Sequence, residues 1–178
     1  MKVPFYLLGL LIRFGPQHGY SLKQSISLGI ADFAKIKLPT IYYHLERMAG
    51  DGFLSASTDR DGNRPEKTVY AVTEQGREYF KKLSQQILVE SYQPEFNLDG
   101  LLYFSDLMDS KKLIEGLLKR RERLNRQHLY IKQHYEDTIN GIPPDSIKWA
   151  AFIFKHHLSH FEAEIEWINK VVAELSTH

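Results

Sequence analysis

The C-terminal part of the chain carries a long and unbroken helical repeat of apolar residues. Between Ile147 and Leu175 these residues recur at alternating spacings of four and three, as in the seam of a coiled coil. The seam consists of Ile147, Ala151, Phe154, Leu158, Phe161, Ile165, Ile168, Val172 and Leu175. Because such a seam must be covered by another helix, we expect a long helix that contributes to a homodimer interface.

A second long helix is expected immediately before this one. Asp109 or Ser110 is a suitable N-cap for it, and the sequence Gly141-Ile142-Pro143-Pro144 interrupts the chain near its end. The final helix then begins at Asp145 or Ser146, and residues 94–108 form a short helix and a loop. These elements predict a helical dimerisation domain over residues 81–178.

The N-terminal segment, from Val3 to Phe14, is apolar on almost every side. A helix with this composition is usually buried on all sides, and a small domain often needs a second chain to achieve that. We therefore expect Phe5, Leu8 and Leu11 to contribute to the dimer interface, together with the seam residues Ile147, Phe154, Leu158, Phe161, Ile165, Ile168 and Val172.

Two helices and a hairpin complete the first half of the chain. One helix is expected from Gly19-Tyr20 to Gly29 with Ser21 as its N-cap, and the next begins near Leu38-Pro39-Thr40. The second of these has a buried stripe of Ile41, Leu45 and Met48. Residues 53–57 and 68–72 have the β-branched and aromatic composition of strands, with a polar turn between them. A further helix starts at Thr73-Glu74 and runs to about Tyr92.

The order helix, helix, helix, strand, basic turn, strand, helix is that of a winged helix-turn-helix domain. The expected fold class is therefore mainly α with a small β-hairpin wing. We expect a winged helix-turn-helix DNA-binding domain over residues 1–80 and the helical dimerisation domain over the rest. Two recognition helices in a homodimer would read a pseudo-palindromic operator in double-stranded DNA.

The third helix and the hairpin tip hold the expected DNA contacts, since such a helix fits the major groove and a basic turn reaches phosphates. Contacts to bases are expected from Thr40, Tyr43, His44 and Arg47, although Thr40 also suits a helix cap. Tyr42 borders the buried stripe and is interpreted either as a core residue or as a phosphate contact. Other backbone contacts are expected from Tyr20, Lys35, Lys37, Arg60, Asn63, Arg64 and Lys67.

Four sequence segments in this region resemble the PadR family of transcriptional regulators. They are Leu8-Gly9-Leu10-Leu11 with Gly15-Pro16-Gln17-His18-Gly19-Tyr20, then residues 40–48 (TIYYHLERM), Gly52-Phe53-Leu54, and residues 70–77 (YAVTEQGR). The resemblance covers about residues 3–80 and implies a dimeric repressor with a helical C-terminal domain. Pro39 and Tyr43 depart from the family pattern, so the base preference of relatives does not carry over.

Charge and composition leave alternatives open. The net charge is only +1, and residues 1–80 hold ten basic against eight acidic residues, a weak footprint for a DNA-binding domain. A winged helix that binds proteins instead of DNA is therefore one alternative. His156, His160 and Glu164 share a helix face beside His157 and allow a second one, a metal sensor, although we expect no metal or other cofactor. Aromatic residues in the C-terminal half allow a small-molecule effector.

Other classes of function are excluded or disfavoured. The chain has no cysteine, which excludes disulfides and thiolate sites. It contains no nucleophile elbow, no phosphate-binding glycine loop and no His-Glu-x-x-His motif, so we expect no enzymatic activity. No apolar run has the length of about 18 residues that a membrane span needs, and we expect a cytoplasmic protein without a membrane partner.

Overall fold

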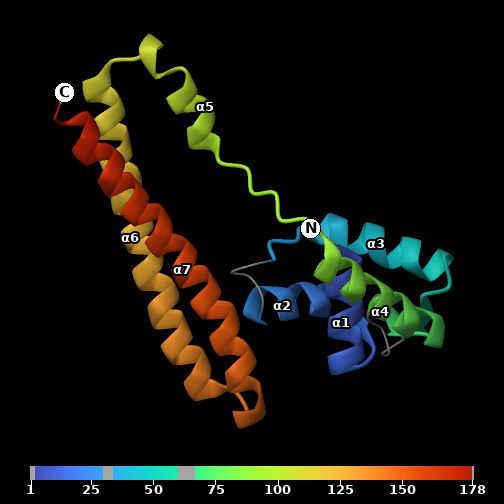
Figure 1. Cartoon of the computed structure of the whole chain (residues 1–178). Coiled ribbons are helices and arrows are strands. Elements are labelled where there is room, and N and C mark those ends of the chain that lie inside the picture. The colour runs from blue at the N-terminus through green and yellow to red at the C-terminus, as the bar shows by residue number, and fades with distance from the viewer. Residues whose placement is uncertain (1–2, 30–33, 60–66, 178) are drawn as a thin grey trace. The chain divides into compact units, whose positions relative to one another are not determined.

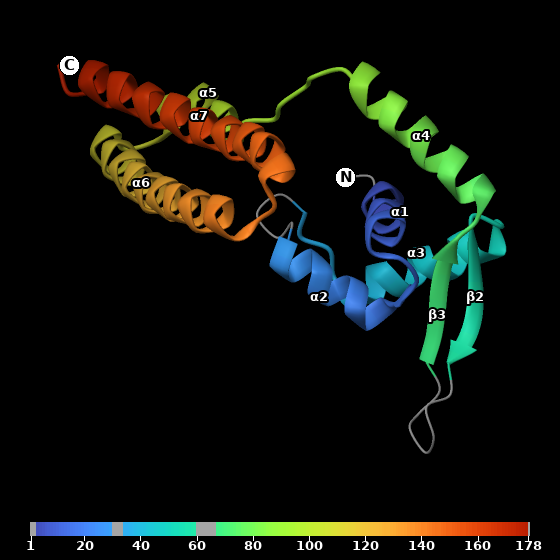
Figure 2. The same cartoon turned by 90° about the horizontal axis from the view of Figure 1, so that it is seen from below.

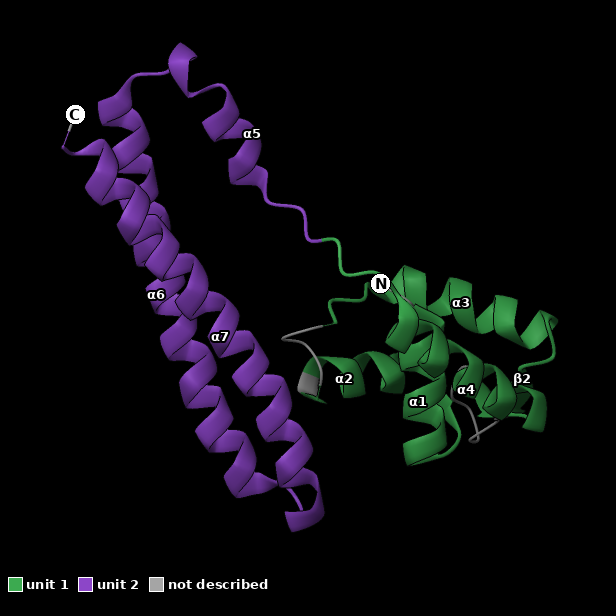
Figure 3. Cartoon of the chain, viewed as in Figure 1, with its two compact units in different colours: residues 1–93 green, residues 94–178 purple. Residues whose placement is uncertain are grey.

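A computed structural model describes residues 3–29, 34–59 and 67–177 of the chain. The chain divides into two compact units, residues 1–93 and 94–178 (Figure 3). The domain boundary expected at residue 80 falls inside the last helix of the first unit. The predicted fold class is confirmed: the chain is mainly helical with one small antiparallel sheet.

The first unit is a winged helix. Its elements are α1 (Val3–Phe14), β1 (Gln17–His18), α2 (Gly19–Gly29), α3 (Leu38–Gly50), β2 (Leu54–Asp59), β3 (Lys67–Val72) and α4 (Glu74–Val89). The hairpin of β2 and β3 projects beside α3 (Figure 2). β3 is the central strand of the order β1-β3-β2. Its Val72 pairs with Leu54 of β2, and its Tyr70 pairs with Gln17 of β1.

The strand β1 was not predicted, and it changes the start of α2. His18 ends the strand, and its imidazole Nδ1 accepts a hydrogen bond from the backbone N–H of Ser21 at 3.1 Å. The helix begins at Gly19, so Ser21 lies in its first turn. The prediction that Ser21 is the N-cap was wrong, because Ser21 lies inside the helix and the ring of His18, just before the helix, caps its N–H.

Helix α1 is buried inside its own unit. Its side chains contact α2, α3, α4 and β3, and the exposed fractions of Leu8 and Leu11 are only 0% and 3%. Phe5 is half-buried and stacks on Phe80 of α4, with 5.0 Å between ring centroids. The argument that an apolar first helix needs a partner chain therefore fails, since Leu8 and Leu11 have almost no surface left for one.

A close contact between the start of α4 and the two residues before β2 fixes the base of the wing. The Thr73 hydroxyl lies 2.8 Å from the Gly52 carbonyl oxygen, to which it donates, and it accepts a hydrogen bond from the Gly76 N–H at 3.1 Å. A β-carbon at Gly76 would overlap the carbonyl of Phe53, so only glycine fits there. Thr73 is the N-cap of α4, one residue before its first helical position, and the sequence predicts the start of a helix at Thr73-Glu74.

The second unit is built on a helical hairpin. It comprises α5 (Asn97–Tyr103), a 3-10 turn η1 (Ser105–Leu107), α6 (Ser110–Gly141) and α7 (Pro144–Leu175). α6 and α7 run side by side (Figures 1 and 2). Asp109 caps α6 by accepting the N–H of Lys111 at 2.8 Å. Arg120 of α6 pairs with Glu164 of α7 at 3.1 Å.

The apolar seam of α7 is covered within the chain. None of its nine residues is exposed: Phe154 and Ile168 are buried, and Ile147, Ala151, Leu158, Phe161, Ile165, Val172 and Leu175 are half-buried. Ile168 packs with Leu113 and Leu117 of α6, and Phe154 contacts the ring of Tyr135 at 5.4 Å between centroids. The coiled-coil spacing is real, but the helix that covers it is α6 of the same chain.

Candidate nucleic-acid interface

The recognition helix α3 is held by one apolar face. Ile41 and Leu45 are fully buried in the core of the first unit, and Met48 is nearly so. Because these residues recur at one helical face, the opposite face is turned to solvent. Tyr43, with an exposed fraction of 57%, and Arg47 lie on that outward face.

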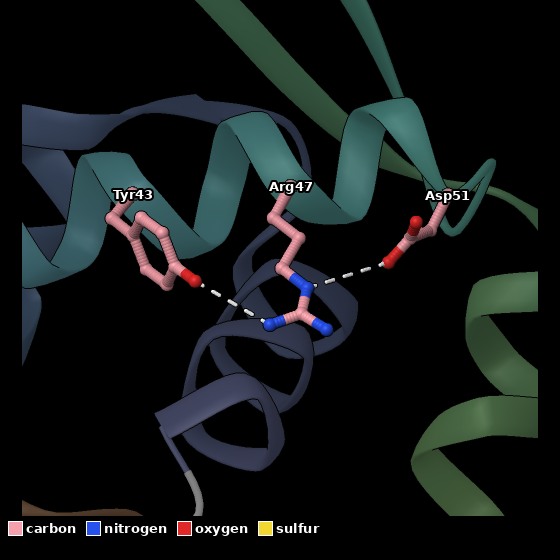
Figure 4. A network of polar contacts seen from close by, with 3 residues as sticks. All are labelled: Tyr43, Arg47 and Asp51. Carbon is pink, nitrogen blue, oxygen red and sulfur yellow. Dashed lines mark hydrogen bonds and ion pairs between the residues drawn. The ribbon is translucent and has the colours of Figure 1, made fainter.

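A short polar chain runs along the outward face of α3. Arg47 donates a hydrogen bond from Nη1 to the Tyr43 hydroxyl at 3.4 Å, and its Nε lies 3.9 Å from Asp51 Oδ2 (Figure 4). The hydrogen bond to Tyr43, followed by the charge of Asp51, raises the pKa of Arg47 above its ordinary value. The guanidinium is thus positioned in advance on an exposed surface, where it remains able to bind a phosphate or a guanine edge.

His44 lies beside the Tyr43–Arg47–Asp51 contacts and is less exposed to solvent. It is half-buried, and its ring meets the ring of Tyr43 edge-on with 5.1 Å between centroids. Burial, and then the charge of Arg47, lowers the pKa of His44 below 6.5. The lowered pKa favours the neutral imidazole, which offers one donor and one acceptor.

No side chain at the N-cap position of α3 accepts a hydrogen bond from the first backbone N–H groups of the helix. Its N-cap position is Lys37, which makes no side-chain cap hydrogen bond, and Pro39 occupies the first turn. Thr40 lies inside the helix and is half-buried, so its interpretation as the cap was wrong. Lys35 and Lys37 are both exposed beside this terminus. Unsatisfied N–H groups with nearby lysines are suited to an anion such as a DNA phosphate.

A polar cavity of about 270 Å³ lies between α3 and the sheet. Tyr20, Tyr42 and Lys67, all expected on the DNA-binding surface, line it with His18, Glu46, Thr68 and Tyr70. Burial, and then the charge of Glu46, raises the pKa of Tyr70. The four additional residues were missed because each is unremarkable in sequence and only the folding of β1 and β3 against α3 brings them together.

Tyr42 has a structural role in this cavity. Its ring lies against Gly19, where a β-carbon would be 2.5 Å from a ring carbon. An exposed fraction of 39% nevertheless leaves part of the side chain accessible. Both interpretations from the sequence therefore fit this residue: the ring packs, and the remaining surface is open.

The wing is described only at its base. Arg60, Asn63 and Arg64, which the sequence places at the tip, lie outside the described residues. Lys67 begins β3 opposite Asp59 and is exposed.

The histidines of α7 do not assemble a metal site in the described part of the chain. His156 and His160 lie with their Nε2 atoms 3.1 Å apart, but Glu164 is engaged by Arg120. No cluster of three or more histidine, aspartate or glutamate ligands occurs among the described residues. No helix within those residues is long and apolar enough to cross a membrane.

Comparison with known proteins identifies the first unit. Residues 7–82 match the model of the transcriptional regulator PadR-like family. This segment of the chain is therefore similar to the regulators of that family. The match spans α3 and both strands of the wing, so the surface described above lies within the matched segment.

Similarity also extends over the second unit. The negative transcriptional regulator PadR of Bacillus subtilis is 21% identical over 97% of both chains. The crystal structure of this PadR in complex with operator DNA superposes with a TM-score of 0.79, at 18% identity and 98% coverage of both chains. Its complex with p-coumaric acid gives a TM-score of 0.78 at 16% identity and the same coverage. These likenesses show that the whole chain shares one fold with that regulator.

Proposed function

We propose that the chain is a homodimeric repressor that binds double-stranded DNA through α3 and the wing and is released by a small effector. The observation that carries this proposal is the outward face of α3, where Tyr43 and Arg47 are exposed while Ile41 and Leu45 anchor the helix in the core. The B. subtilis relative, named as a negative regulator, has been crystallised with operator DNA and with p-coumaric acid. Such a regulator acts in the cytoplasm with its DNA, and the proposal includes no catalytic step.

The proposed DNA contacts are of two kinds, contacts to bases and contacts to phosphates. We assign Tyr43, His44 and Arg47 of α3, together with Thr40 near its N-terminus, to contacts with bases. Lys35, Lys37, Tyr20 and Lys67 surround this helix and are exposed, so we assign them to phosphates together with Arg60, Asn63 and Arg64. Tyr42 packs its ring against Gly19, and we assign its exposed part to a phosphate contact.

The dimer is assigned to the apolar surface that the α6–α7 hairpin leaves exposed. Leu129 and Tyr130 of α6 and Trp149, Phe152 and Ile153 of α7 are all exposed in the single chain. Several exposed large apolar side chains on one helical hairpin are typical of a protein interface. The half-buried seam residues Ile147, Leu158, Phe161, Ile165 and Val172 retain some surface that a partner would cover as well.

Selection of bound duplexes from a random pool tests the proposal directly. A pseudo-palindromic consensus is expected, with affinity that falls as salt is added. Arg47→Ala should weaken binding to that consensus by about tenfold or more, as expected for a lost base or phosphate contact of about 1–3 kcal/mol. Arg77→Ala, an exposed arginine on α4, is the matched control. Absence of binding even at low salt would instead favour a winged helix that binds proteins.

A further inference from the structure

The second unit contains a small cavity that the proposed DNA contacts do not use. It has a volume of about 250 Å³ and lies between α5, Met108 and the first turns of α6. Its apolar wall is made of aliphatic side chains only: Leu98, Leu101, Met108, Leu113 and Leu117. The volume is below the range of about 300–1,000 Å³ typical of sites for drug-sized ligands, so a small occupant is implied.

The polar side chains at this cavity are all cationic. Lys112, Arg120 and Arg123 line it, and no carboxylate does. Arg120 is engaged by Glu164 at 3.1 Å, although its Nε is buried without a hydrogen-bond partner among the described residues. Lys112 and Arg123 form no ion pair with any residue that the structure describes. The cavity therefore combines an apolar wall with an excess of positive charge.

A glycine keeps the cavity open along α6. Gly116 lines it in the interior of a 32-residue helix, where glycine is the least favoured residue apart from proline. A β-carbon at this position would meet nothing within 4 Å, so neighbouring atoms do not require the glycine. What the glycine provides is free space between the turns that carry Lys112 and Arg120.

We propose that this cavity binds a small aliphatic carboxylate. Arg123 pairs with the carboxylate through its planar guanidinium, Lys112 adds positive charge, and the leucines with Met108 cover the alkyl tail. An aliphatic tail fits better than an aromatic ring because none of the lining residues is aromatic. The binding stands by itself; only its role as the effector that releases DNA depends on the proposed function.

Calorimetric titration of octanoate into the full-length protein, without DNA, tests the site. Saturable binding with one molecule per protomer is expected, and Arg123→Gln should weaken it by about tenfold or more, the effect of losing a charge-assisted pair. Lys132→Gln removes an exposed cation on the same helix away from the cavity and should change nothing. Gly116→Met should abolish binding while thermal unfolding remains cooperative, because its side chain fills the free space.

Several outcomes would overturn the site. These are the absence of saturable binding, equal affinity for octylamine, tighter binding of cinnamate than of octanoate, or full affinity in both Arg123→Gln and Gly116→Met. Addition of the selected operator separates the two proposals. If octanoate binds but no duplex does, the proposed function fails and the site stands; if a duplex binds and octanoate does not, the reverse holds.

Discussion

The ring of Tyr42 lies so close to Gly19 that a β-carbon there would be 2.5 Å from it. This contact joins the recognition helix to the start of α2, next to the exposed Tyr20. Replacement of Gly19 by alanine must therefore displace the ring of Tyr42 on the surface of α3. We expect Gly19→Ala to weaken operator binding by about tenfold, equivalent to about 1.4 kcal/mol. Electrophoretic mobility shifts would measure it.

Gly29→Ala is the matched control for that variant. Gly29 ends the same helix, and a β-carbon there would meet nothing within 4 Å. Equal operator affinities for Gly19→Ala and the unmodified chain would show that the position of Tyr42 does not matter for binding.

The Thr73 cap should control the stability of the first unit. Thr73→Ala removes the hydroxyl that caps α4 and donates to the Gly52 carbonyl. Loss of an N-cap costs about 0.5–2 kcal/mol, and we expect a value near the upper end because the second hydrogen bond is lost as well. Urea denaturation followed by circular dichroism would report it. A midpoint that does not move would contradict the assigned role.

Acid should destabilise the first unit through His44. Its folded-state pKa lies below the unfolded value of 6.5, mainly because of burial. The stability associated with the neutral ring is complete above the unfolded pKa and is lost as the pH falls through the lower, folded pKa. Denaturation midpoints measured from pH 7.5 downward should therefore decline below about pH 6.5. His44→Gln should decline less over that interval, and identical slopes would disprove the coupling.

Helix α6 should be stabilised by alanine at position 116. Gly116→Ala removes the cost of glycine in a helix interior, about 1 kcal/mol, and its β-carbon meets no other atom within 4 Å. The melting temperature of the second unit should therefore rise. A lower melting temperature would mean that the free space at this position is needed for folding rather than for a ligand.

The exposed aromatic pair on α7 tests the dimer assignment. Trp149 and Phe152 pack edge to face with 6.0 Å between ring centroids, and both are more than half exposed. Replacement of both by serine should produce monomers in sedimentation experiments with little change in the unfolding of the hairpin, since neither residue belongs to its core. A dimer of unchanged stability would show that Trp149 and Phe152 do not belong to the dimer interface.

Local signals were sufficient to predict most helices. The helix start at Thr73-Glu74, the cap Asp109 and the stripe of Ile41, Leu45 and Met48 identified α4, α6 and α3, because helix starts and periodicity are signals within a few residues. The strand β1 was missed because two residues show no periodicity. His18 and Glu46 were missed for a related reason: they become part of one surface only when separate elements meet.

The interface residues show where sequence reasoning reached its limit. Spacing of four and three along α7 defines a helix face, but it does not specify whether the covering helix belongs to the same chain. Ile168, for example, is fully buried against Leu113 and Leu117 of its own α6. Burial of Leu8 has the same explanation within the first unit.

Because α6 of the same chain covers the apolar seam of α7, the hairpin can fold without association of two chains. Each protomer can complete its own hairpin during synthesis, before it meets a second copy. In the proposed homodimer the subunits would therefore separate while each stays folded, so dilution would reduce the amount of dimer without unfolding the protein. At protomer levels below the dimer dissociation constant, operator occupancy would then rise with the square of protein concentration. Repression would respond steeply to small changes in expression.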